Sequence, residues 1–315
     1  MLRRICSFVV LLTLCIAGVG QDGTKSIKSE EYLKTRPESS KTETGLQSSS
    51  GRNTKGNQSR SGVRSHIYTA DKNFAVGPPP RAHEFVRIGL TIWRFSPGQC
   101  AIPNCPPPTG ATKGLFDTSA GTRVDDSVAL STGERVRLGL ESLSHDGFVY
   151  VIDREQFADG TFGDPYLIFP TKSINNGKNY ARPGLQVQLP RAEGCFCVKL
   201  RDPRRVLVAD NLIVIVSPQP LLTPENIGVK EIPLPAQLTS YVGRADKEQS
   251  QRATLKEGTG LPQTTTEQMA GTKGLVDTEP VLTQSDLPPQ NVYQSLVPQG
   301  HAAVFSVYLR YNSKP

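Results

Sequence analysis

Apolar and polar residues alternate with a period of two along much of the chain between residues 86 and 218. This is the pattern of β-strands that bury one face. The alternation is regular in residues 135–141, 185–189 and 196–200. In residues 135–141 the apolar side chains are expected to face a core and the charged side chains to face water. The pattern predicts half-buried strands.

Two other runs are apolar on both faces and are therefore expected at the centre of a sheet. They span residues 148–152 and 212–216. Residues 166–169 follow the first run closely and are predicted to form a hairpin with it. Together with residues 86–92 and 302–311 these segments give eight strands with no long helical period between them. The fold class predicted is all-β, a two-sheet β-sandwich of immunoglobulin-like or related type.

One of these eight strands has an irregular pattern. Residues 86–92 alternate cleanly, but Trp93 and Phe95 then fall on the opposite face. A β-bulge near Ile92 would produce this change of face.

The first 20 residues form a signal-peptide pattern. Arg3 and Arg4 precede a short apolar run that ends in small residues, which predicts cleavage before Gln21. The run is shorter than the roughly 20 apolar residues of a membrane-spanning helix. We therefore expect no permanent membrane span after cleavage, and a periplasmic, cell-surface or secreted location.

The rest of the chain divides by composition. Residues 21–82 are polar, lack a sustained apolar period and end in a Pro-rich spacer, which predicts a disordered leader. Residues 83–315 are predicted to form a single β domain. Its core is residues 86–218 plus the last strand, 302–311.

Residues 219–300 are predicted to be a long irregular excursion before the last strand, because they are rich in Pro and Thr. Within them, only residues 236–256 contain enough helix-forming residues for a short helix.

Charge argues against nucleic acid as a partner. The formal net charge is +7, but the basic residues form no cluster interleaved with aromatic residues, and no nucleic-acid-binding module is recognisable. The excess of basic residues in the leader would attract an anionic envelope surface weakly, although a solvated tether is the simpler interpretation.

Four cysteines remain once the signal peptide is removed. An even number in an oxidising compartment predicts at least one disulfide, with the connectivity left open. Two cysteines two residues apart on one strand, about 6.5 to 7 Å between Cα atoms, would pair only with distortion. The other two flank a turn that could close locally or be reached by the strand pair. A zinc site would use all four thiolates, but the spacing departs from the usual ligand spacing. The candidates are Cys100, Cys105, Cys195 and Cys197.

An ordered series of short motifs resembles the bacterial domain of unknown function 4384, in its exported, stand-alone form. The motifs are GFVYVIDRE at 147–155, LIFP at 167–170, PG at 183–184 and LP at 189–190. The resemblance implies a β-rich accessory domain, often attached to caspase-like peptidase or kinase domains. Neither partner domain is recognisable in this chain, which leaves the interpretation as a binding module.

No catalytic motif is recognisable. The four histidines lie in no metal or triad motif, and the chain has no G-x-S-x-G, no Gly-rich phosphate loop and no His-Glu-x-x-His. We therefore predict no enzyme activity, no catalytic residue and no cofactor.

A polar patch in the connection after residues 148–152 offers a calcium site as a weak alternative, because Ca²⁺ prefers several oxygen ligands. The spacing fits no known calcium loop, and Asp-Gly and Gly-Asp pairs are ordinary turn chemistry. The favoured prediction is that these carboxylates shape an exposed hairpin tip. They are Asp153, Glu155, Asp159 and Asp164.

Three functions follow in order of preference. The first is a non-catalytic binding or interaction module of the cell envelope or secreted fraction, with an unknown protein or envelope component as its partner. The second is a structural tethering protein. The third is a hydrolase with an unrecognised acidic site, which would need an acidic pair in a cleft.

Overall fold

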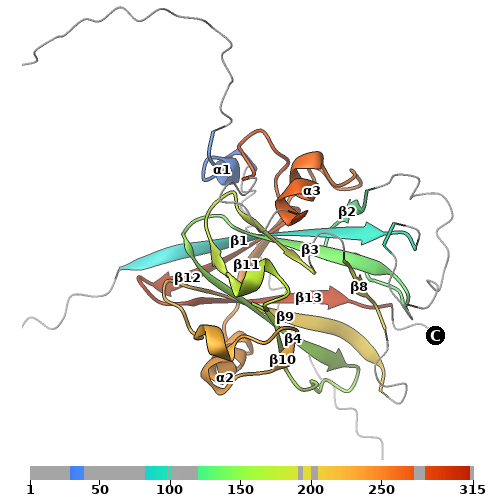
Figure 1. Ribbon diagram of the computed structural model, residues 1–315, viewed down its shortest axis with the longest axis vertical. Helices are drawn as coiled ribbons and strands as arrows, with labels where there is room; N and C mark the ends of the chain where they lie inside the picture. Colours follow the sequence, from blue (N-terminus) through green and yellow to red (C-terminus); the bar gives the residue numbers. More distant parts are fainter. Residues whose placement is uncertain are drawn as a thin grey trace, which may run out of the picture.

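The computed structural model describes residues 29–38, 82–97, 99–100, 105, 120–190, 194–199, 205–272 and 281–312. The predicted signal peptide and the leader, apart from residues 29–38 and 82, lie outside the described residues. The described chain forms two antiparallel sheets, which confirms the prediction of an all-β two-sheet sandwich (Figure 1).

The first sheet has seven strands. Its main path is β11 (Gln251–Thr254), β12 (Asn291–Pro298), β1 (His83–Phe95), β3 (Arg135–Ser142) and β7 (Gln186–Leu189). Two short strands lie off this path, β2 (Thr122–Val124) beside β1 and β8 (Phe196–Cys197) beside β3.

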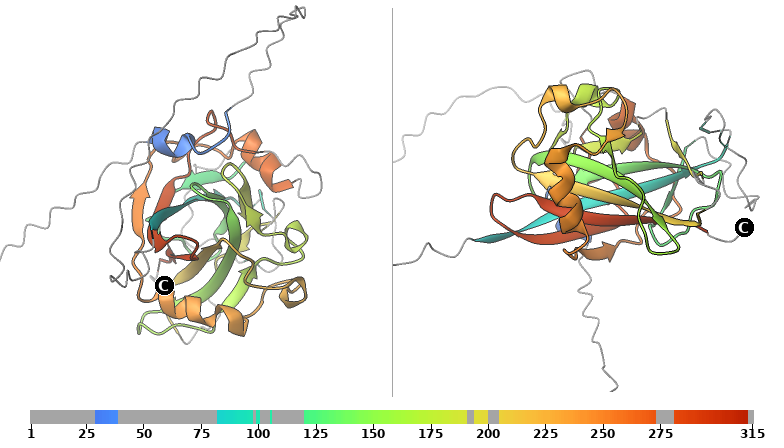
Figure 2. Two further views of the ribbon diagram at one scale, coloured as in Figure 1. Left: turned by 90° about the vertical axis from the view of Figure 1, so that its left-hand side faces the viewer. Right: turned by 90° about the horizontal axis from the view of Figure 1, so that it is seen from below.

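The second sheet has six strands, and the two sheets curl around a common core (Figure 2). Its main path is β10 (Ile232–Pro233), β5 (Tyr166–Phe169), β4 (Gly147–Phe157), β9 (Leu207–Ser217) and β13 (Ala303–Arg310), with β6 (Tyr180–Ala181) beside β4.

Among the described residues, three short helices lie outside the sheets. They are α1 (Ser29–Leu33), α2 (Thr239–Ala245) and α3 (Thr265–Thr272), and three single 3₁₀ turns accompany them at Asn175–Gly177, Pro224–Asn226 and Ala236–Leu238. Helix α2 packs on β9 and β13, and α3 packs on β7. Within the described residues, no helix has the length and apolar character that a membrane crossing requires.

The predicted central strands are confirmed. Strand β4 lies between β5 and β9, and β9 lies between β4 and β13. Their inward side chains, such as Val151 and Val214, belong to the core between the sheets, and their outward side chains, such as Ile152 and Ile213, are equally buried. Burying an aliphatic side chain contributes about 1.5–3 kcal/mol. This contribution explains why strands that are apolar on both faces take central positions.

The predicted hairpin and the predicted place of the last strand in the β domain are also confirmed. Strand β5 forms the hairpin with β4, with Phe169 opposite Val151. The last strand, β13, returns to the sheet and pairs with β9, with Phe305 opposite Val214. The predicted short helix within residues 236–256 is α2.

The prediction of half-buried strands was wrong for β3. All eight of its residues are buried, including Arg135, Arg137 and Glu141. The polar face does not meet water, because segments from elsewhere in the chain cover the outer face of the first sheet. Strand β7 is buried on both faces for the same reason.

The bulge predicted near Ile92 is not present. The register of β1 against β3 runs without a shift from Ile88 to Phe95. Trp93 and Phe95 simply occupy the outer face of the sheet, where they pack with Cys100 and Cys195. The apparent switch of face in the sequence reflects a strand that is buried on both sides.

One segment of the predicted leader packs on the domain. Residues 29–38 fold against the first sheet, with Tyr32 and Arg36 buried. The folded unit therefore includes this segment in addition to the predicted β domain.

Residues 219–300 are not wholly irregular either. They contain β11, β12, α2 and α3, and β12 pairs with β1 along its full length. Strand β12 was missed because its apolar residues come in adjacent pairs, Val292 with Tyr293 and Leu296 with Val297, and this spacing gives no period of two.

Candidate ligand-binding cleft

On three neighbouring strands of the second sheet, the inward-facing side chains change from apolar to polar at the same end. On β4 the row of Val149 and Val151 continues with acidic residues, and on β9 the row that contains Leu212 does the same. On β13 the row ends in a tyrosine just beyond the strand. The polar members are Asp153, Glu155, Asp210 and Tyr311.

Strand pairing brings these polar side chains together. Asp210 lies directly opposite Glu155 on β4 and opposite Leu309 on β13. The Tyr311 hydroxyl donates a hydrogen bond to the Asp210 carboxylate. Directly opposed residues in an antiparallel pair are close enough for their side chains to interact. The polar end of the core is therefore one connected surface.

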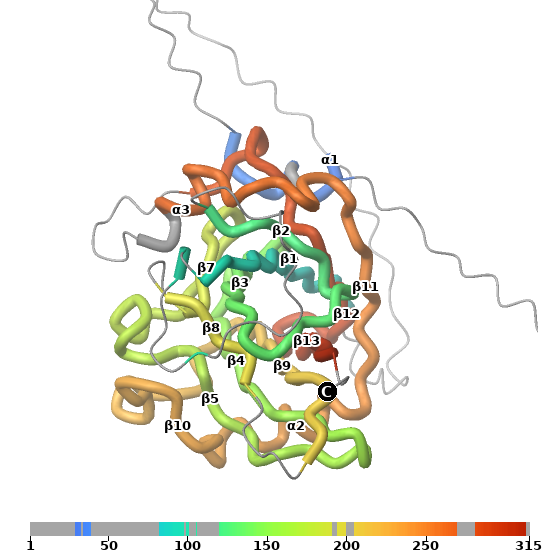
Figure 3. The backbone as a smooth tube through the Cα atoms, turned by 90° about the vertical axis from the view of Figure 1, so that its right-hand side faces the viewer, coloured from blue at the N-terminus to red at the C-terminus, as the bar shows by residue number. Residues whose placement is uncertain are grey.

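This surface lines a cleft of about 590 Å³ between the two sheets. The cleft lies at the end of the molecule where β8, β4 and β9 come together, which is the end that Figure 3 faces. Its volume falls in the range of small-molecule sites. The apolar lining consists mainly of Val136, Leu138, Ile168, Leu212 and Leu309, and the described charged lining consists of Asp153, Glu155, Lys199, Asp210, Lys230 and Glu231.

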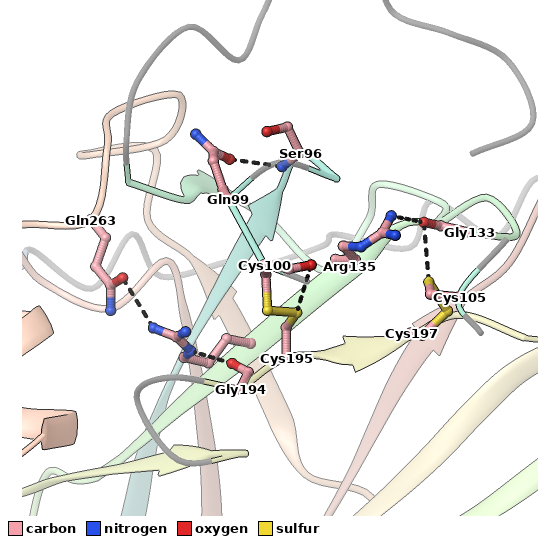
Figure 4. The surroundings of a disulfide bond; sticks show 11 residues. Ser96, Gln99, Cys100, Cys105, Gly133, Arg135, Gly194, Cys195, Cys197 and Gln263 are labelled. Atoms are coloured by element: carbon pink, nitrogen blue, oxygen red, sulfur yellow. Dashed lines mark hydrogen bonds between the residues drawn. A yellow bond between two sulfur atoms is a disulfide. The ribbon is translucent and has the colours of Figure 1, made fainter. Parts of the chain in front are cut away.

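One wall of the cleft is β8 and its flanking residues, and two disulfides attach this wall to the segment after β1. Cys100 pairs with Cys195 and Cys105 with Cys197, with Cα separations of 6.5 and 5.9 Å (Figure 4). This pairing confirms the predicted disulfide and selects the alternative in which the strand pair reaches the 100–105 turn. Strand β8 pairs with β3 at only two residues, so the disulfides provide much of the attachment of this wall.

A buried arginine supports the same wall. The Arg137 guanidinium lies over the Phe95 ring at 4.6 Å, and its Nε donates to the Gly194 carbonyl at 2.9 Å. Burial lowers the pKa of Arg137 to about 10, so the side chain is still charged at neutral pH. Arg137 therefore holds the residue next to Cys195 in place.

The four predicted hairpin carboxylates separate into two pairs. Asp153 and Glu155 line the cleft, whereas Asp159 and Asp164 are exposed outside it. The prediction that all four lie at an exposed tip was wrong for the first pair, because β4 continues to Phe157 and carries both residues within a strand.

The true hairpin tip is formed by turn chemistry, as predicted for Asp159. Its carboxylate accepts hydrogen bonds from the Thr161 amide at 2.9 Å and the Thr161 hydroxyl at 2.5 Å. These bonds lower the pKa of Asp159. Gly160 supplies the positive φ of 81° that the turn requires.

The weak calcium alternative finds no support in this arrangement. Because two of its four carboxylates line the cleft and two project away from it, the set does not converge. Within the described ranges, no group of three or more His, Cys, Asp and Glu side chains is placed to hold a metal ion.

Sequence reasoning missed Asp210, Tyr311, Lys199, Lys230 and Glu231 as cleft residues. A signal for the first two was present: each extends the inward row of a strand by one alternation, as Asp153 and Glu155 do on β4. Which strands are neighbours was the missing information.

No protein-family model matches the chain, and no match was found among curated proteins or solved structures. The resemblance to domain of unknown function 4384 therefore stays a prediction.

Proposed function

We propose that the chain is an exported, non-catalytic β-sandwich module that binds a ligand in the cleft between its sheets. The observation that carries this proposal is the placement of Asp153, Glu155 and Asp210 on adjacent strands in the lining of a cleft that also has apolar walls. A ligand that fits such a site has an apolar body, which displaces water from the apolar lining, and a cationic group beside the carboxylates.

The described lining favours a cationic group. Its carboxylates are those of Asp153, Glu155, Asp210 and Glu231, against the ammonium groups of Lys199 and Lys230. Three of the carboxylates lie on the adjacent strands β4 and β9, where a single ammonium or guanidinium group could contact more than one of them. Such a group occurs in amines and in basic peptides.

A pair of fluorescent probes tests the proposal. Dansylcadaverine carries an apolar ring system and a primary amine, and dansylglycine carries the same ring system and a carboxylate. We expect the full-length protein to bind the amine at least about tenfold more tightly than the acid, as measured by the fluorescence change on titration.

Two variants locate the binding. Asp210→Asn should weaken binding of the amine about tenfold, because it removes charge from the cleft. Asp164→Asn is the matched control, since it removes an exposed carboxylate of the β4–β5 connection outside the cleft, and it should bind like the parent. Equal affinity for both probes, or equal affinity of parent and Asp210→Asn for the amine, would argue against a cationic ligand.

Export is a separate part of the proposal. Two disulfides support it, because disulfides persist mainly in oxidising compartments. Protein recovered from the periplasm or medium should begin at Gln21 by N-terminal sequencing and contain no free thiol. A chain that retains residues 1–20, or one recovered with four free thiols, would contradict export by this route.

A further inference from the structure

Residues 29–38 are held against the outer face of the first sheet by one aromatic and one cationic side chain. Tyr32, in α1, is buried in a cluster with Leu143, Leu255 and Val292. Arg36, four residues later, enters the sheet face, and its side chain is only 1% exposed. Helix α1 lies beside the first sheet, away from α2 (Figures 1 and 2).

The Arg36 guanidinium is surrounded by acceptors. Its Nε and one terminal nitrogen donate to the two oxygens of Glu141 at 2.8 and 2.7 Å. The other terminal nitrogen donates to the carbonyl oxygens of Thr283, Asp286 and Leu287 at 3.1 to 3.3 Å. This forked geometry fits the planar guanidinium of arginine and not the ammonium group of lysine.

The domain's own hydrogen bonds shape the site around Glu141 that holds Arg36. The Asp286 carboxylate accepts from the Thr283 amide at 2.7 Å and from its hydroxyl at 2.9 Å, which closes the turn that presents the three carbonyls. Gly184 donates its amide to Glu141 at 3.3 Å. A Cβ at position 184 would lie 2.6 Å from the Leu282 carbonyl oxygen, so only glycine fits there.

The site around Glu141 also binds the backbone of the segment. The Gln284 side chain donates to the Arg36 carbonyl at 3.0 Å, and the Gln284 amide donates to the Pro37 carbonyl at 3.1 Å. Side-chain pockets combined with main-chain hydrogen bonds are the usual means of recognising a linear peptide.

The chain between this segment and β1 does not impose the docking. Residues 39–81 join the two, and 43 residues can span up to about 140 Å. The contacts with Tyr32 and Arg36 therefore have to select the site.

We propose that the site around Glu141 recognises a Tyr-x-x-x-Arg peptide, and that its occupant is the segment 29–38 of the chain itself. The leader thus acts as a tethered ligand of the domain. This site is independent of the cleft, which lies at β8, β4 and β9.

The test uses full-length protein and a labelled synthetic peptide of residues 29–38. In Tyr32→Ala/Arg36→Ala the tethered segment loses both anchors, so the added peptide should bind saturably by fluorescence anisotropy. The parent should bind the same peptide at least about tenfold more weakly, because its own segment competes. A peptide carrying Arg36→Lys should bind the double variant about tenfold more weakly than the native peptide.

Two further variants serve as controls for this test. Adding Gln284→Ala to the double variant should weaken peptide binding without removing the Glu141 carboxylate. If the double variant does not fold, as judged by circular dichroism, a protease site is placed within residues 39–81 of the parent. Cleavage then tests whether residues 29–38 stay bound to the domain without the covalent link. The freed segment should co-elute with the domain and be displaced by excess native peptide.

The proposal is overturned if the folded double variant does not bind the native peptide or binds the Arg36→Lys peptide equally well. It is also overturned if the cleaved segment separates from the domain. Concentration-dependent dimers that excess peptide dissociates would support the site and show that the segment also docks between copies.

Discussion

The outer faces of the two sheets are both buried, but they differ in how far both members of a covering ion pair are buried. On the second sheet the buried Arg154 pairs with Asp246 at the end of α2, and the Asp246 side chain is 45% exposed. The second sheet is covered by α2 and neighbouring loops, which lie on apolar side chains such as Tyr150, Ile152 and Ile213. The first sheet is covered by residues 29–38 on one part and by α3 on another (Figure 1). Each of these contacts contains an ion pair whose two members are both buried. These pairs are Arg36 with Glu141 and Arg123 with Glu267, each with side-chain exposures of at most 2%.

The difference concerns selectivity more than stability. An apolar face accepts any apolar surface of suitable shape, because the hydrophobic effect has no direction. A buried ion pair adds little net stability, since desolvation offsets the attraction, but a charge left without its partner is costly. The first sheet is therefore selective about which segment covers it.

The largest expected effect comes from removing one member of a buried pair. Arg123→Ala leaves the Glu267 carboxylate buried without its cation, and removes a hydrogen bond of 2.9 Å to the Pro288 carbonyl. We expect the free energy of unfolding to fall by about 3–5 kcal/mol. Chemical denaturation followed by circular dichroism measures it.

The matched control removes both charges. Arg123→Met/Glu267→Gln keeps volume and retains an oxygen to accept from the Thr264 amide, which Glu267 now does at 2.8 Å. If the cost of Arg123→Ala comes from the uncompensated charge, the double variant should lose clearly less stability than the single variant. An equal or larger loss would mean that the pair itself stabilises the fold.

On the second sheet the corresponding change is the loss of volume. Ile213→Ala should lower the free energy of unfolding by about 2–5 kcal/mol and Ile213→Val by about 0.5–1.5 kcal/mol, because Ile213 is fully buried beneath the α2 side of the sheet. This graded dependence on volume distinguishes the apolar face. A loss with Ile213→Val as large as that with Ile213→Ala would indicate a specific contact instead.

The same difference explains which parts of the fold the sequence predicted. Strands β4 and β9 were placed correctly because their covered outer faces carry apolar residues such as Ile152 and Ile213. Burial of these faces is therefore visible in the sequence of each strand. The covered face of β3 carries Arg137 and Glu141, which have the same pattern as a solvent-facing strand. Their partners lie in distant segments that no local pattern connects with β3.

The candidate cleft was predictable only in part, for a related reason. Asp153 and Glu155 could be singled out, but Asp210 joins them only through the register of β4 and β9. Glu267 did carry a local signal, since Thr264 and Glu267 have the spacing of a helix capping box, and their reciprocal hydrogen bonds are present. That signal marks the start of α3 but not its ion pair with Arg123.

The buried Asp126 extends the comparison of buried charges to the dependence of stability on pH. Asp126 accepts a hydrogen bond from the Tyr293 hydroxyl and pairs with Arg252. Burial nevertheless raises the pKa of Asp126, because desolvation outweighs these two contacts. The folded state thus holds this proton more tightly than the unfolded chain does.

It follows that the contribution of Asp126 to stability is present at acidic pH, below its pKa in the unfolded chain. The contribution is lost as pH rises through the pKa of the folded state. Asp126→Asn does not titrate, so the melting temperature of the parent minus that of Asp126→Asn should decrease as pH rises from about 3.5 to 7. Thermal unfolding of both proteins across this range measures the difference. An increase with pH would mean that Tyr293 and Arg252 outweigh desolvation.

The smallest effect is expected from an exposed pair at the end of α2. Arg244 in the last turn of the helix donates from Nε at 2.7 Å to Glu248, which follows the helix, and both side chains are more than one-third exposed. Glu248→Gln removes this pair while leaving the Arg244 hydrogen bond to the Ala302 carbonyl available. The free energy of unfolding should fall by no more than about 0.5 kcal/mol, and the difference should vanish in about 0.5 M salt because exposed charges are screened. The loss of stability in Glu248→Gln is compared with that in Arg123→Ala by the same denaturation. The comparison tests whether the large loss expected for Arg123→Ala comes from burial of the ion pair and not from the presence of an ion pair alone. A salt-independent loss near that of Arg123→Ala would mean that an exposed pair stabilises the fold as much as a buried one, and burial would then not explain the difference between the two covered faces.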